Sequence, residues 1–90
     1  MKIKDVFNID FMKILNFFEE YEEELFTQQT LINKNVTYYL KVAYFINIFE
    51  NLGIIESVKI TGMGNIKLYK LNKKSTMYDQ IKELIKKIKD

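Results

Sequence analysis

Two neighbouring stretches, residues 49–56 (FENLGIIE) and 66–71 (IKLYKL), decide the expected fold of this 90-residue chain. Gly53 stands at the end of a helical pattern, where a residue without a Cβ can take the left-handed conformation that ends a helix. Residues 54–61 and 66–71 are rich in β-branched and aromatic side chains, and the glycine-rich segment 62–65 separates them. These features predict a helix, a glycine stop, a strand, a tight turn and a second strand.

The residues up to Leu52 predict three helices in succession. The first is expected to begin with Asp10 as its N-cap and to continue for about four turns, at ~3.6 residues per turn. Its apolar residues recur at spacings of three and four: Phe11, Ile14, Leu15, Phe18, Tyr21 and Leu25. Thr27 is expected to cap a short second helix over residues 28–34, and Thr37 a third helix that ends at Leu52. The apolar stripe of this third helix is Val42, Phe45, Ile46, Phe49 and Leu52.

A last amphipathic helix is expected to start at Ser75 or Thr76. Its narrow apolar stripe comprises Met77, Ile81, Leu84, Ile85 and Ile88. Lysines cover much of the remaining surface, and those of the last turn suit the helix dipole. Because a lone helix of this length is marginal in water, we expect the stripe to dock on another surface.

This order of elements resembles the winged helix-turn-helix family. The resemblance rests on Leu52-Gly53-Ile54-Ile55 at the end of the third helix and on Tyr69-x-Leu71 at the end of the hairpin, and it covers roughly residues 10–72. It implies an α+β winged helix-turn-helix fold: a three-helix core plus a two-stranded β-hairpin wing, here with an additional C-terminal helix over residues 75–90. It also implies that Leu25-Phe26 form a short first strand. We expect residues 1–90 to form a single winged-helix domain.

Composition disfavours an enzyme. The chain has no histidine and no cysteine, so the usual general base, thiol nucleophile and soft metal ligands are missing. We therefore expect no catalytic residue, no cofactor and no metal site. The acidic run Glu19–Glu24 is interpreted as a solvated face, since no Asp/Gly loop pattern surrounds it. Gly62-x-Gly64 lacks the third glycine of a nucleotide-binding loop and joins two strands, so that interpretation is rejected.

No apolar run approaches the ~18 residues that span a membrane. The N-terminal residues Met1–Asp5 are charged and precede no unbroken hydrophobic segment, so no secretion signal is expected. From these features we expect a cytoplasmic protein without membrane contact.

Charge is unevenly distributed along the chain. Residues 1–30 hold three lysines and seven carboxylates, which gives −4, whereas residues 31–90 hold eleven lysines and five carboxylates, which gives +6. A basic C-terminal part beside an acidic first helix indicates one face suited to a polyanion. All basic residues are lysines. Without the arginine fork that reads guanine edges, we expect a preference for A·T-rich sites.

The resemblance implies binding of double-stranded DNA by a small transcriptional regulator, with the third helix in the major groove and the wing on phosphates. The expected DNA-binding residues are Tyr38, Tyr39, Lys41, Tyr44, Asn47, Lys59, Lys67 and Lys70. Tyr39, Tyr44 and Asn47 are the expected base readers, and the four lysines the expected phosphate contacts. One of the three tyrosines is expected to lie in the core and two to be exposed.

The third helix departs from common family members because Lys41 is its single basic residue. One alternative is a winged-helix module that binds another protein, as an adaptor or inhibitor, and no DNA. The lysines of the hairpin could likewise be a solvated surface without a partner.

The C-terminal stripe allows three interpretations. It can fold back on its own domain, pair with a second copy as terminal helices do in MarR-, ArsR- and PadR-type regulators, or lie on a membrane surface. Three acidic residues, Asp79, Glu83 and Asp90, and the lack of aromatic anchors argue against the membrane. We expect a homodimer whose dimerisation residues are Met77, Ile81, Leu84, Ile85 and Ile88, because two half-sites increase affinity. No small-molecule ligand is expected.

Overall fold

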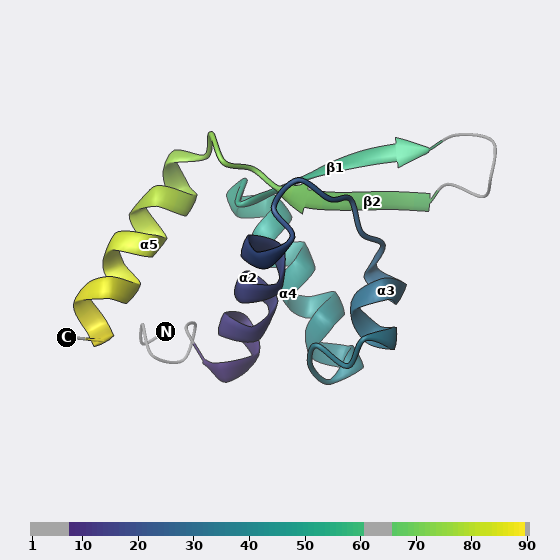
Figure 1. The fold of residues 1–90 in the computed structure, drawn as a ribbon, viewed down its shortest axis with the longest axis horizontal. Helices are drawn as coiled ribbons and strands as arrows, with labels where there is room; N and C mark the ends of the chain where they lie inside the picture. The colour runs from purple at the N-terminus through teal and green to yellow at the C-terminus, as the bar shows by residue number, and fades with distance from the viewer. Residues whose placement is uncertain (1–7, 61–65, 90) are drawn as a thin grey trace.

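The computed structural model describes residues 8–60 and 66–89 (Figure 1). Along the chain the elements are α2 (Ile9–Glu20), α3 (Gln28–Asn33), α4 (Tyr39–Leu52), β1 (Ile55–Ile60), β2 (Ile66–Leu71) and α5 (Thr76–Lys89). The described part is thus α+β, with four helices and one two-stranded antiparallel hairpin, which agrees with the expected class. The expected turn at residues 62–65, together with Thr61, residues 1–7 and Asp90, lies outside the described residues.

Helix α2 starts earlier and ends earlier than the sequence predicts. Its N-cap is Asn8, whose side chain accepts a hydrogen bond of 2.9 Å from the backbone N–H of Phe11, so the assignment of Asp10 as the cap is wrong. The helix stops at Glu20, which leaves Leu25 outside it and exposed. The glutamates at residues 22–24 favour this early end, because carboxylates interact unfavourably with the negative C-terminal end of a helix.

The predicted N-cap of α3 is confirmed, whereas that of α4 is wrong. Thr27 caps α3 as predicted, with its hydroxyl accepting a 3.1 Å bond from the backbone N–H of Thr30. Thr37 does not cap α4: Tyr38 occupies the cap position without a side-chain bond, and the Thr37 hydroxyl donates to the Asp10 carboxylate on α2. Gly53 ends α4 at φ +78°, as predicted, and its N–H donates to the carbonyl of Glu50.

The hairpin is antiparallel, and its register runs from Ile55 opposite Leu71 to Ile60 opposite Ile66. Phe26 adds an isolated bridge to Tyr69, with backbone bonds of 2.8 and 2.7 Å, where the resemblance implies a short strand. Because side chains alternate across a strand, Ile55, Tyr69 and Leu71 share one face, and all are buried.

The core lies between this face of the hairpin and the helices, which lie below the hairpin in Figure 1. Phe11 of α2 meets Phe45 and Phe49 of α4 in edge-to-face contacts with ring centroids 5.9 and 4.8 Å apart. The predicted stripe of α4 is buried except at Leu52. Packing of α2 on α4 therefore fixes how α4 is presented to solvent.

Helix α5 lies beside α2, at the end of the molecule opposite the hairpin tip (Figure 1). Ser75 accepts a 3.0 Å bond from the backbone N–H of Tyr78, so the predicted start is confirmed. Tyr78, Ile81 and Ile85 pack on the core of their own chain. The Glu19 carboxylate of α2 accepts 2.6 Å bonds from the Tyr78 hydroxyl and from Lys82 Nζ. Among the described residues, no helix is long and apolar enough to cross a membrane.

Candidate nucleic-acid interface

The outward face of α4 is polar and aromatic. Leu40, Tyr44, Asn47 and Asn51 follow one another at intervals of four, three and four residues, which places them on one side of the helix, and all are exposed. The opposite side packs on α2 and α3. The structure therefore packs one side of α4 on α2 and α3 and leaves its outward face exposed.

All three tyrosines of this region are exposed, so the expectation that one of them lies in the core is wrong. Tyr38, Tyr39 and Tyr44 expose 59%, 54% and 53% of their surface. The core positions are filled instead by the phenylalanines of the α4 stripe. The Tyr38 and Tyr39 rings lie 4.9 Å apart, and Tyr44 meets Phe45 edge-on at 5.0 Å.

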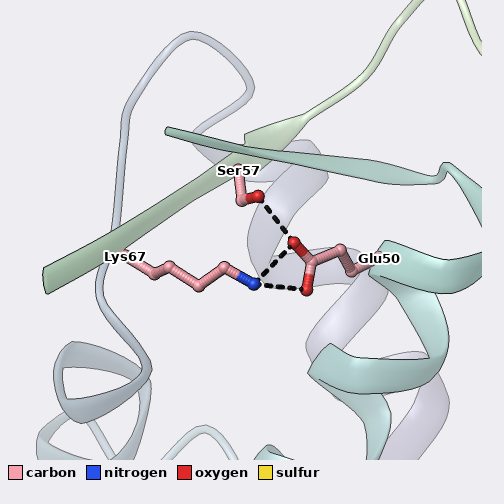
Figure 2. Close-up of polar contacts among 3 residues, drawn as sticks. All are labelled: Glu50, Ser57 and Lys67. Atoms are coloured by element: carbon pink, nitrogen blue, oxygen red, sulfur yellow. Dashed lines mark hydrogen bonds and ion pairs between the residues drawn. The ribbon is translucent and has the colours of Figure 1, made fainter. Parts of the chain in front are cut away.

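A polar contact ties α4 to the hairpin (Figure 2). The Glu50 carboxylate accepts a 2.6 Å bond from the Ser57 hydroxyl on β1 and bonds of 3.0 and 2.9 Å from Lys67 Nζ on β2. The bond from Ser57, followed by that from Lys67, lowers the pKa of Glu50 below its ordinary value of 4.5. The bond to Glu50 likewise raises the pKa of Lys67. This Glu50 tie joins the C-terminal part of α4 to both strands of the hairpin.

The hairpin lysines fall on two faces. Lys59 and Lys67 are cross-strand partners, on the side of the hairpin that meets α4, whereas Lys70 lies on the other side opposite Glu56, at 3.7 Å. Lys41 lies on the flank of α4 opposite Glu50, by helical spacing. Within the described residues, Lys41 and Lys59 have no ion-pair partner, while Lys67 and Lys70 each have one. The structure thus brings Lys59 and Lys67 together with α4 and separates Lys70 from them.

The acidic run is only partly the solvated face that the sequence predicts. Glu22 and Glu23 are exposed and share Lys73, 3.0 Å from the Glu22 carboxylate, at the base of the hairpin. The hydrogen bond from Lys73 lowers the pKa of Glu23. Glu19 is instead largely covered, because it anchors α5. In the described ranges, no group of three or more carboxylates is arranged to hold a metal ion.

Sequence reasoning missed three residues of this surface. Leu40 and Asn51 belong to the outward face of α4, and helical spacing from Asn47 was the signal that could have found them. The role of Glu50 in joining α4 to the hairpin could not be predicted from sequence, because its partners Ser57 and Lys67 lie on the two strands, seven and seventeen residues further along the chain.

Comparison with family models, with curated proteins and with solved structures finds no match to this chain.

Proposed function

We propose that the protein binds double-stranded DNA as a small transcriptional regulator, with α4 in the major groove and the hairpin along the adjacent backbone. The observation that carries this proposal is the open face of α4, supported from beneath by α2 and α3 and joined by Glu50 to the lysine-bearing side of the hairpin. A helix with its side chains fits the ~12 Å width of the major groove.

The chemistry of the outward face suits A·T base pairs. Asn47 and Asn51 can each pair with the N6 and N7 edge of adenine, and the Tyr44 ring and Leu40 can contact a thymine methyl group. Tyr39, which the sequence predicts as a base reader, lies outside the row formed by Leu40, Tyr44, Asn47 and Asn51, so we assign its hydroxyl to phosphate instead. The Tyr38 hydroxyl and the ammonium groups of Lys41, Lys59 and Lys67 also suit phosphates. Lys70, on the other side of the hairpin, is the least favourably placed of the proposed phosphate contacts.

Selection from random duplexes should return an A·T-rich consensus, and a G·C-rich consensus would contradict this assignment.

A salt titration tests the phosphate contacts. Lys41→Ala and Lys59→Ala should each weaken binding to every duplex and lower the slope of log K against log salt by ~0.9, because each removes one phosphate contact. Lys13→Ala is the matched control, since Lys13 is an exposed lysine on α2, away from the open face. Unchanged slopes in both variants would refute the proposed interface.

A second candidate function has its own support. Tyr38, Tyr39, Leu40 and Tyr44 are all more than half exposed, and such aromatic and aliphatic surfaces are typical of the centre of a protein–protein interface. A protein-binding module would form no salt-dependent complex with random or A·T-rich duplexes. The same gel-shift titration at two salt concentrations therefore separates the two functions.

A further inference from the structure

We infer that Glu50 is an internal competitor of the DNA backbone: its carboxylate holds Lys67 and so withholds one positive charge of the hairpin from phosphate. This rests on the DNA binding proposed above and assigns a residue that limits its strength. Two features carry it, namely the position of Lys67 opposite the unpaired Lys59 and the geometry of the contact between Lys67 and Glu50.

Lys59 and Lys67 lie directly opposite each other in the hairpin, on the side that meets α4, and both are exposed. Like charges at cross-strand positions repel each other, so a negative group beside them is stabilising. Among the described residues, Glu50 is the one carboxylate that forms an ion pair with either lysine. Two positive charges and one negative charge leave a net charge of +1. This side of the hairpin therefore carries two lysines but presents one unbalanced positive charge to a polyanion.

The hold on Lys67 is well defined. Lys67 Nζ donates to both carboxylate oxygens of Glu50, at 3.0 and 2.9 Å, and lies 5.8 Å from the centre of the Tyr69 ring. The Ser57 hydroxyl donates to the same carboxylate at 2.6 Å, so an uncharged group on β1 helps to orient it. Figure 2 shows the Lys67 side chain extending toward Glu50. The ammonium group is thus directed to α4 of its own chain.

A carboxylate and a phosphate compete for the same ammonium group, because both are negatively charged oxygen acceptors. DNA gains affinity from each phosphate that a lysine neutralises, since bound counter-ions are then released. Lys67 is already neutralised by Glu50 and adds little to this gain, although 44% of its side chain is exposed and within reach of solvent. Glu50 therefore weakens binding to any duplex and leaves a larger share of the binding free energy to the base contacts of α4.

The other side of the hairpin supplies a matched comparison. Glu56 on β1 and Lys70 on β2 are cross-strand partners, with an ion pair of 3.7 Å, on the side that faces away from α4. Removal of the Glu56 charge changes the net charge of the chain by the same amount as removal of the Glu50 charge. It frees a lysine that does not adjoin the outward face of α4. The two substitutions therefore separate a local effect on the interface from an effect of overall charge.

A gel-shift titration on random and A·T-rich duplexes, between 50 and 200 mM salt, tests the role of Glu50. Glu50→Gln keeps the shape of the side chain and an oxygen that can accept from Ser57, but it no longer balances Lys67. The variant should bind both duplexes more tightly than the unaltered chain, with a slope of log K against log salt steeper by ~0.9. The gain in affinity should accordingly shrink about 3.5-fold between 50 and 200 mM salt. Glu56→Gln should leave the slope unchanged.

A double variant tests whether the pair is silent in DNA binding. Glu50→Gln/Lys67→Met removes both partners, and it should show the salt slope of the unaltered chain, because the paired lysine neutralises no phosphate there. A slope lower by ~0.9 would show that Lys67 leaves Glu50 and contacts phosphate in the complex, which would overturn the inference. Far-ultraviolet circular dichroism reports whether each variant is folded. A merely structural role for Glu50 predicts the opposite sign for the single variant, since a loosened hairpin would weaken binding.

The outcomes also separate this role from DNA binding itself. If the unaltered chain forms a salt-dependent complex but Glu50→Gln binds no more tightly, or Glu56→Gln gains as much, Glu50 is not a competitor and the proposed DNA binding stands. If the unaltered chain forms no complex with either duplex, DNA binding is refuted and the role of Glu50 with it.

Discussion

Gly53 shows how one residue controls the junction between α4 and the hairpin. Its φ of +78° lies in the left-handed region, which costs residues with a Cβ about 1–2 kcal/mol. A Cβ built there would meet only Ser75 Oγ, at 4.0 Å, so space is available and the backbone conformation alone opposes substitution. Gly53→Ala should therefore lower the free energy of unfolding by about 1–2 kcal/mol in urea denaturation. Gly53→Asn should cost less, because asparagine tolerates this conformation; equal losses would point to a steric cause instead.

Cap residues show where sequence reasoning succeeds and fails at this scale. Thr27 was identifiable because a polar residue directly precedes a short apolar pattern. Asp10 and Thr37 have the right chemistry for caps, yet they bond to each other across 27 residues. Residue type predicts which side chains can cap a helix, but the choice between a local and a distant partner depends on how α2 packs near the start of α4.

Among the contacts between elements, the Glu50 tie makes the attachment of the hairpin to α4 dependent on pH. The pKa of Glu50 is lower in the folded chain than its ordinary 4.5, so its stabilising contribution is present above that value and is lost as pH falls through the folded value. Glu50→Gln should cost up to about 1 kcal/mol at pH 7, a modest amount because the pair is partly exposed to solvent. At pH 3 the difference from the unaltered chain should shrink. Urea denaturation at both pH values measures it, and an equal difference at both would contradict the role assigned to the carboxylate.

The positions of helices and strands could be predicted from periodicity more readily than the exposure and facing of individual side chains. The buried stripe of α4 and the glycine stop were predictable because hydrophobic spacing and the absence of a Cβ act locally. The exposure of Tyr38, Tyr39 and Tyr44 was not, because a tyrosine suits both a core and a surface. The division of hairpin lysines between two faces required the register, which pairs Lys59 with Lys67 and Lys70 with Glu56. Register depends on the turn and on contacts far along the chain.

For the whole molecule, the structure shows which part of the apolar stripe of α5 packs on the core of its own chain. The sequence showed a single stripe and assigned all five of its residues to dimerisation. The structure buries Ile81 and packs Ile85 on the core, whereas Met77 and Ile88 remain exposed. Which residues of α5 pack on their own domain depends on the surface that α2 presents to them. The hydrophobic pattern of α5 alone does not predict that surface.

Ile81 distinguishes packing within the chain from packing between copies. Ile81 exposes only 7% of its surface. Ile81→Ala should therefore lower the free energy of unfolding by about 2–4 kcal/mol, and Ile81→Val should lower it by about 0.5–1.5 kcal/mol. Because the contact lies within one chain, both losses should be the same at low and high protein concentration, whereas a contact between copies would make them depend on concentration.

Ile88→Ala is the matched control: Ile88 is exposed on the same helix, so in the dilute monomer its replacement should change stability by less than about 0.5 kcal/mol. Chemical denaturation followed by circular dichroism across a hundredfold range of concentration makes the measurement. A loss for Ile81→Ala that appeared only at high concentration would place Ile81 between copies and separate α5 from the core of its own chain.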